Sequence, residues 1–231
     1  MDDPREAVGL ALRGLADTLR HHRDLGLRDL TLATVPFPDP TDALREQERA
    51  RQGCQLCKLC KSRTNVAFGS GNARARIMVV GEGPGEEEDK QGVPFVGRAG
   101  QLLTRMLASV GFDRERDCYI ANVVKCRPER NRNPEPDEVA ACSPFLMAQI
   151  DTIRPVVVLA LGNFAAQTLL GTKEGITRLR GREFPFRDDV VLIPTLHPSA
   201  VLRNGGAALA SARADFVLAK RSLCRRRGGA R

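Results

Sequence analysis

The sequence contains no tryptophan, one tyrosine and no long apolar run, and these absences narrow what the protein can be. No apolar stretch approaches the ~20 residues that a helix needs to cross a bilayer. The charged start of the chain, MDDPREAVGL, does not resemble a signal peptide. We therefore expect a cytoplasmic protein with no membrane partner. With Tyr119 as its only tyrosine, the protein should absorb very little in the near ultraviolet.

Acidic side chains are absent from residues 220–231, and this absence explains most of the net charge. That stretch holds six lysines and arginines, so the formal net charge of +8 leaves only +2 for residues 1–219. The basic character therefore indicates a basic tail rather than a basic groove. Such a tail adds salt-dependent affinity for nucleic acid, or is a solvated end without a specific role.

A disulfide pattern is also missing, although the chain has seven cysteines. In a cytoplasmic chain, cysteines seldom form a disulfide framework. Cys54, Cys57 and Cys60 are each separated by two residues, and further cysteines follow at Cys118, Cys126, Cys142 and Cys224. A CxxC pair with distant partners predicts a metal or cluster site, and its spacing alone suits zinc and iron–sulfur equally.

The order of apolar and helical patterns predicts three parts of the chain. Residues 1–53 form an extension, with a helix over 4–25, a proline-rich linker over 33–42 and a second helix capped by Thr41. Residues 54–224 form the domain, and 225–231 the basic tail. Within the domain we expect strands at Ile77–Val80, Tyr119–Val124, Val156–Leu161 and Val190–Pro194, and helices at 98–110, 136–153, 163–170 and 207–224. Alternating strands and helices predict an α/β fold, a three-layer αβα domain with a central four-stranded parallel sheet.

Unusual residues follow each predicted strand, at the edge where open parallel sheets bind ligands. The first strand leads into Gly81–Gly100, a glycine-rich loop with four successive acids and the lone aromatic Phe95. This loop suits a planar, uncharged ligand, because its carboxylates would repel phosphate; alternatively, it is a solvated acidic helix start. The second strand contains Asn122, and the fourth leads into His197-Pro198-Ser199. A lone histidine is commonly structural, but this position favours a functional role.

These residues carry a resemblance to a known family. The matching text is Arg63-Thr64, Phe68-Gly69, GEGPGEEED (81–89), PFVGRAGQLL (94–103), YIANVVKCRP (119–128), NRNPEPDE (131–138), Cys142, LGNFAAQTLLG (161–171) and HPSAVLR (197–203). In this order it is similar to the iron–sulfur uracil-DNA glycosylases of the fourth family, the bacterial and archaeal type. The match covers 54 to about 205, so the extension and the basic end lie outside it.

The resemblance implies a DNA repair enzyme that flips uracil out of DNA and hydrolyses its N-glycosidic bond, located at the bacterial nucleoid. Phe95 would stack on the base, Asn122 would bind its N3/O4 edge, and His197 would stabilise negative charge on O2. Glu82 and Glu88 match acidic positions of the family's first motif and are candidate catalytic residues. Gly83 lies where other glycosylase families place a carboxylate or amide, so backbone, Glu82 or Glu88 must hold the attacking water.

The resemblance also implies DNA contacts and a cofactor. Ser199 is expected to meet a phosphate, whereas Leu202 and Arg203 are candidates to fill the gap that the flipped base leaves. The implied ligands of a [4Fe–4S] cluster are Cys54, Cys57, Cys126 and Cys142. Cys60 is an extra thiol, and we expect the cluster to join residues 54–57 to the 126–142 segment. We expect a monomer, with residues 1–53 as a candidate site for a protein partner.

Two alternative functions remain open at this point. One is a binder that becomes covalently trapped on uracil-DNA through a histidine, but the loop between Cys126 and Cys142 has no histidine. The other is a metal-stapled nucleic-acid-binding module without catalysis. Within the enzyme reading, hypoxanthine or xanthine is an alternative substrate base.

Overall fold

The four apolar strands expected from the sequence form the centre of one sheet. The computed structural model of the chain describes residues 38–187 and 189–226. The central strands are β2 (Ile77–Gly81), β3 (Cys118–Asn122), β4 (Val157–Leu161) and β6 (Val190–Thr195). β2 pairs in parallel with β3 and β4, and β4 pairs in parallel with β6. Short strands rich in Val and Ile are typical of a sheet that is covered on both faces.

Two edge strands were not predicted. The six strands have the order β1-β3-β2-β4-β6-β5, and both outer strands run antiparallel to their neighbours. β1 (Ser70–Gly71) has only two residues, and β5 (Phe184–Arg187) contains Pro185 and is half exposed. Neither gives the continuous apolar run by which a buried strand is recognised. The sheet is therefore mixed, with the predicted parallel strands at its centre.

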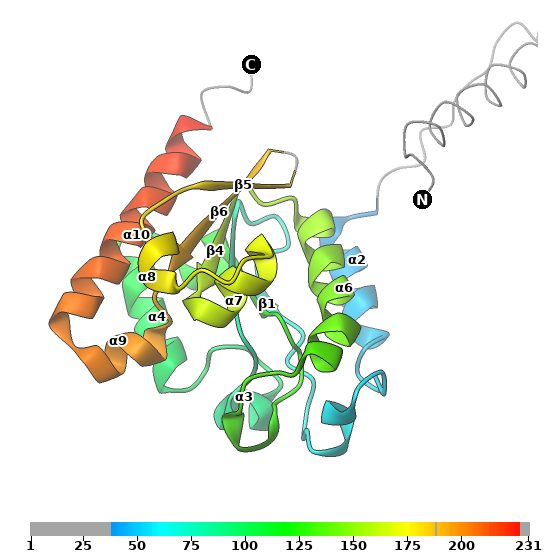
Figure 1. Cartoon of the computed structure of the whole chain (residues 1–231). Coiled ribbons are helices and arrows are strands. Elements are labelled where there is room, and N and C mark those ends of the chain that lie inside the picture. Colours follow the sequence, from blue (N-terminus) through cyan, green and yellow to red (C-terminus); the bar gives the residue numbers. More distant parts are fainter. Residues whose placement is uncertain (1–37, 188, 227–231) are drawn as a thin grey trace, which may run out of the picture. The chain divides into compact units, whose positions relative to one another are not determined.

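Helices cover both faces of the sheet, as a three-layer fold requires (Figure 1). On one face Met78, Val80 and Val158 pack against α2 (Pro40–Arg49), α6 (Pro136–Ile153), α7 (Gly162–Leu170) and α8 (Ile176–Leu179). On the other face Ile77, Val79 and Leu159 pack against α4 (Arg98–Ser109), α9 (Pro198–Asn204) and α10 (Gly206–Arg225). Successive residues of one strand serve opposite layers because side chains alternate along a strand. The remaining short helices are α3 (Glu86–Gln91), α5 (Arg114–Asp117), η1 (Lys58–Lys61) and η2 (Glu129–Asn131).

Helix α2 belongs to the compact unit, although the sequence assigned it to the extension. Its N-cap is Asp39 and not the expected Thr41, because the Asp39 Oδ1 accepts the Thr41 N–H at 2.8 Å. Leu44 is buried in the core, and Gln47 Nε2 donates to Thr152 Oγ1 on α6 at 2.8 Å. The compact unit thus begins at Pro38. The extension before it and the tail beyond residue 226 lie outside the described residues. Among the helices of residues 38–187 and 189–226, none combines the length and the apolarity of a membrane span.

Candidate active site and cysteine centre

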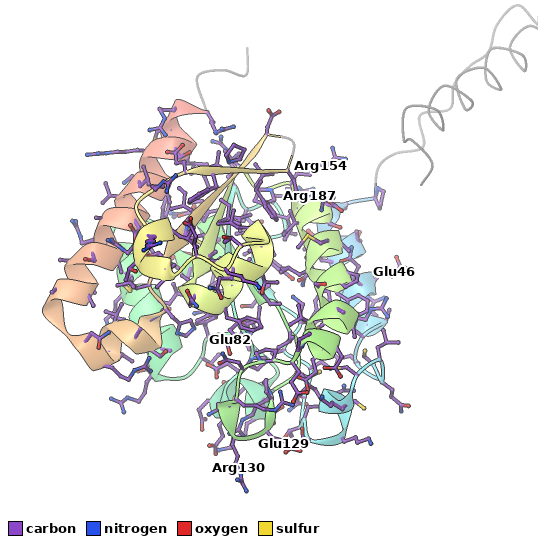
Figure 2. The ribbon with its side chains drawn as sticks, in the orientation of Figure 1. Glu46, Glu82, Glu129, Arg130, Arg154 and Arg187 are labelled. Carbon is purple, nitrogen blue, oxygen red and sulfur yellow. The ribbon has the colours of Figure 1, made fainter. Side chains whose placement is uncertain are left out.

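A cleft of about 680 Å³ lies at the carboxyl edge of the parallel strands. Its lining includes Glu82 after β2, Asn122 at the end of β3, Leu161 at the end of β4 and His197 after β6. Figure 2 labels Glu82 in the space between α7 and α3. The expected convergence at this edge is confirmed. Of the residues singled out from the sequence, the cleft brings together Glu82, Gly83, Glu88, Phe95, Asn122, His197, Ser199 and Arg203.

Phe95 is held in the cleft by an unusual backbone. Its φ is 56°, in the left-handed region that a bulky residue rarely adopts. The Arg114 guanidinium fixes this turn, because it donates to the carbonyl oxygens of Pro94 at 2.7 Å and Phe95 at 2.8 Å. A Cβ on Gly100 would lie 1.8 Å from the Phe95 oxygen, so only glycine lets α4 approach this turn. The ring is therefore placed by contacts from α4 and Arg114.

Asn122 brings an unsatisfied hydrogen-bond acceptor to the cleft. The side chain is 1% exposed, and its Oδ1 has no hydrogen-bond partner among the described residues. A Cβ on Gly81 would lie 2.4 Å from this oxygen and 2.5 Å from Cζ of Phe95. Gly81 therefore allows the amide and the ring to lie next to one another. Because an unpaired buried acceptor is costly, Oδ1 suits a ligand that donates a hydrogen bond.

His197 is a neutral imidazole of defined tautomer. The backbone N–H of Ser199 donates to Nδ1 at 3.2 Å, and the Ser199 hydroxyl lies 2.8 Å from the same nitrogen. Nδ1 is thus an acceptor, and the hydrogen of the neutral ring is on Nε2. Burial, together with the nearby charge of Arg203, lowers the pKa of His197 to about 4. The ring centroid lies 5.7 Å from that of Phe95. The site therefore offers an N–H donor near neutral pH without a full positive charge.

The two acids of the first loop have different surroundings. Glu88 Oε1 accepts the backbone N–H groups of Val96 and Gly97, both at 2.9 Å, and its Oε2 accepts that of Gly85 at 3.1 Å. Glu88 thereby ties the Gly85 turn to the turn that carries Phe95. The Glu82 carboxylate makes no ion pair or hydrogen bond with the described residues, and burial raises its pKa. Glu82 is the acid of the pair that is free to meet a ligand or a water.

The predicted DNA contacts divide between the cleft and the surface of α9. Ser199 and Arg203 line the cleft, and the Ser199 hydroxyl is engaged with His197. Leu202 does not line the cleft, but it is 42% exposed, which is unusual for a large apolar side chain in the described chain. Gly83 does line the cleft, and a Cβ there would lie 2.8 Å from the Val124 side chain.

Sequence reasoning placed Gly81 and Gly162 at this edge but did not assign them the role of making room for these side chains. Gly162 has a φ of 87°, and a Cβ there would lie 2.9 Å from Cβ of His197. Gly81 and Gly162 each directly follow the apolar run of a strand, and that position is a signal that a sequence search can use. Arg114 gives no such signal, because its role depends on contacts with a turn 20 residues earlier.

The four predicted cluster cysteines form what we call the cysteine centre: Cys54, Cys57, Cys126 and Cys142. Cys126 and Cys142 are buried in one core cluster, and Cys57 packs against it. Burial raises the pKa of the Cys126 thiol to about 11 and also raises the pKa values of Cys57 and Cys142. The charges of Cys54 and Cys57 contribute to the rise at Cys142, so the four sulfurs lie in one electrostatic neighbourhood.

Nitrogen donors surround the sulfurs of the cysteine centre. The backbone N–H of Lys125 donates to Cys142 Sγ at 3.3 Å, and Arg63 donates to Cys126 Sγ at 3.4 Å. Within 38–187 and 189–226, no three cysteine, histidine or acidic side chains are grouped closely enough to hold a single metal ion. The hydrogen bonds to Cys126 and Cys142 place a positively polarised N–H group beside each of these two sulfurs.

Comparison with known proteins places this architecture among the DNA glycosylases. Residues 68–221 match the family model described as the uracil DNA glycosylase superfamily. The chain is similar to the type-4 uracil-DNA glycosylase of Thermotoga maritima, with 54% identity over 158 residues, which is 68% of this chain and 81% of that protein. It is also similar to the type-4 enzyme of Archaeoglobus fulgidus (45% over 168 residues; 70% and 84%) and that of Sulfurisphaera tokodaii (43% over 171 residues; 71% and 77%).

Proposed function

The chain belongs to the uracil DNA glycosylase superfamily, and from this premise we propose that it removes uracil from DNA by hydrolysing the N-glycosidic bond. The observation that carries the proposal is the buried Asn122 Oδ1, which has no partner among the described residues and lies beside the ring of Phe95. Uracil is flat and uncharged, and its N3–H is the donor that this oxygen lacks. An enzyme of this kind must first extrude the base from the stack, at a cost of a few kcal/mol.

We assign recognition of the base to three groups: the ring of Phe95, the amide of Asn122 and the backbone at Gly83. Phe95 stacks on the flipped ring, with a contribution of about 1–3 kcal/mol. Asn122 accepts from N3–H and donates to O4. Cytosine presents the reverse pattern, so the same amide rejects it. The backbone at Gly83 approaches the base because no side chain intervenes.

His197 stabilises charge that exists only during bond cleavage. Uracil leaves as an anion whose charge rests partly on O2, while the sugar acquires oxocarbenium character. The Nε2–H of a neutral imidazole donates to O2, with Ser199 holding the tautomer from the other nitrogen. Such a donor is typically worth about 10²–10³ in rate. Ser199 therefore holds the imidazole of His197 in one tautomer. A contact between Ser199 and a DNA phosphate, which the sequence predicts, would be a second role of this residue.

Glu82 is the candidate to position the water that attacks C1′. Its carboxylate is partly removed from water and has no partner among the described residues, so it is available to accept a hydrogen bond from water. Glu88 acts differently, because its oxygens are occupied by three backbone N–H groups. We assign Glu88 a positioning role for Phe95 and the Gly85 turn.

The cysteine centre fits a [4Fe–4S] cluster held by Cys54, Cys57, Cys126 and Cys142. Four thiols are the usual ligand set of such a cluster, and N–H donors to the sulfurs, like those at Cys126 and Cys142, are a usual feature of its sites. Lys125, which is 2% exposed, contacts the Asn122 carbonyl and Gln149 and makes no ion pair with a carboxylate among the described residues. Burial lowers its pKa to about 7, so an anionic group beside it would favour its charged form. When bound, the cluster would join the 54–57 segment to the 126–142 segment, and the reaction requires no electron transfer from it.

The DNA partner is proposed to lie across α9. Leu202 and Arg203 fill the space of the extruded base, and Ser199 lies near the backbone of its strand. A monomer suffices for this arrangement, since every group named above comes from one chain. Residues 1–53 remain a proposed site for a protein partner, and the bacterial nucleoid the proposed location.

A glycosylase assay tests the proposed function. The protein is incubated with a duplex oligonucleotide that contains one uracil, and alkali then cleaves the strand wherever an abasic site has formed. We expect strand cleavage together with free uracil, and neither product from a duplex with cytosine at the same position. A stable protein–DNA adduct without free uracil, or binding of DNA without any product, would contradict the proposed glycosylase activity.

A further inference from the structure

Four non-glycine residues in the described chain have a left-handed backbone: Phe95, Arg130, Asn131 and Arg154. Phe95 lines the cleft. Arg154 is the C-cap of α6, where this conformation is common. Arg130 and Asn131 are consecutive, with φ values of 53° and 57°, and neither caps a helix of the core. Strained backbone of this kind persists where surrounding contacts enforce it, and such positions cluster at functional sites.

The contacts that enforce this turn come from the arginines on either side of it. Arg127 Nε donates to the Asn131 Oδ1 at 2.8 Å. Arg132 donates through both terminal nitrogens to the buried carboxylate of Glu138, at 2.8 and 2.6 Å. Arg127 and Arg132 are therefore occupied in holding the turn. Asn131 and Arg132 also line the cleft, so the turn forms part of its rim.

Arg130 is the cation that this turn presents to solvent. Its side chain is exposed, and its guanidinium has no ion pair or hydrogen bond among the described residues. The neighbouring Glu129 acts on Arg132, whose pKa it helps to raise. Figure 2 shows Arg130 projecting from the end of the molecule beyond Glu82. Arg203 on α9 supplies a second exposed cation in the lining of the same cleft.

From this geometry we propose that Arg130 binds a phosphate of the DNA backbone, as a contact on the cleft rim separate from α9. The proposal rests on the proposed function, since it assumes that DNA occupies the cleft. A planar guanidinium suits phosphate, because its N–H groups can donate to two phosphate oxygens. A rigid turn also lowers the cost of ordering the loop when DNA binds. The contact positions the strand and carries no base specificity.

The test compares two matched variants, Arg130→Asn and Arg154→Asn. Asparagine tolerates the left-handed backbone and removes the charge in both cases. Arg154 precedes β4 at the opposite edge of the sheet, and Figure 2 shows it at the far end of the described chain from Arg130. Affinity for a duplex with a non-cleavable uracil analogue is measured over a series of salt concentrations, so the readout does not depend on excision.

For Arg130→Asn we expect the slope of log affinity against log salt to become shallower by about 1, because one fewer phosphate is neutralised. Arg154→Asn should keep the wild-type slope, and Arg130→Lys should keep most of it. An unchanged slope in Arg130→Asn, or an equal change in both asparagine variants, would overturn the proposal. If the wild type binds this duplex but releases no uracil from a cleavable one, the proposed function fails while the phosphate contact stands.

Discussion

The cleft and the cysteine centre lie at the two ends of one short buried segment, residues 122–126, but the chain builds them differently. At the cleft end, Asn122 and Phe95 both lie against Gly81, where a Cβ would clash with each of them. The buried Asn122 Oδ1 has no partner among the described residues and is left for a ligand. At the other end, Cys126 and its partner thiols are buried with raised pKa values, and nearby cations face them.

The cleft and the cysteine centre therefore depend on their bound groups in different ways. The cleft is organised before its ligand arrives, as a site must be when it stabilises a transition state and then releases products. The cysteine centre collects sulfurs whose ionised form is unfavourable until a metal group binds them, so its stability depends on that group. Changes at the cleft should therefore alter rate, whereas changes at the centre should alter stability.

The largest expected effect is on rate, from His197→Ala. Because its Nε2–H acts on charge that develops only as the bond breaks, single-turnover uracil release should fall about 10²–10³-fold. Affinity for a non-cleavable uracil duplex and the melting temperature should change little. A variant that retains the wild-type excision rate would refute the mechanism.

The next effect is on stability, from Cys126→Ala. We expect loss of a broad absorption band near ~400 nm, which is typical of thiolate-bound iron, in protein purified without air. Without the bound group the melting temperature should fall by about 10 °C, which corresponds to several kcal/mol for a domain of this size. Cys224→Ala is the matched control, because that thiol is exposed and lies on α10. If the wild type is folded, colourless and contains zinc, the cluster assignment is wrong.

A smaller effect should differ between Glu82 and Glu88, the two acids of the cleft. Glu88→Gln replaces an acceptor with a donor beside the Gly85 N–H, and should lower stability by about 1–3 kcal/mol. The carboxylate of Glu82 makes no such hydrogen bond, so the Glu82→Gln variant should keep the wild-type melting temperature. Its rate of uracil release should fall, while its affinity for uracil-containing DNA should stay unchanged. Thermal melts and single-turnover rates of the two variants, measured side by side, check both halves. Equal stability losses would remove the distinction that we draw between them.

The smallest effect is a pH dependence of stability. The folded pKa of His197 is about 4, below its ordinary value of 6.5, so the unfolded chain takes up a proton first as the pH falls. The folded state should therefore lose up to about 2 kcal/mol relative to the unfolded state between pH 7 and pH 5 from this residue. His197→Gln should lack that part of the loss, which denaturant melts at the two pH values will measure. Identical pH dependence in both proteins would show that His197 is not held neutral by burial.

Much of the fold follows from local pattern. The apolar runs of β2 and β4 identify those strands without reference to any distant residue, and α6 begins and ends where its helical pattern does. The edge strands β1 and β5 could not be found in this way, because they are short and only partly buried. Their pairing is decided by the neighbouring strand, not by their own composition.

The sequence by itself determined which chemical groups meet, because residues that follow parallel strands must lie at one edge of the sheet. Phe95, Asn122 and His197 could be assigned to that edge on this ground. Only the tertiary structure decided what each group is free to do. The carboxylate of Glu88 accepts hydrogen bonds from the backbone N–H groups of Val96 and Gly97, eight and nine residues further along the chain. No such group of the described residues reaches the carboxylate of Glu82, which is therefore free to bind a ligand or a water. Burial and hydrogen bonding depend on contacts between segments that are distant in sequence, and a local sequence pattern cannot predict these contacts.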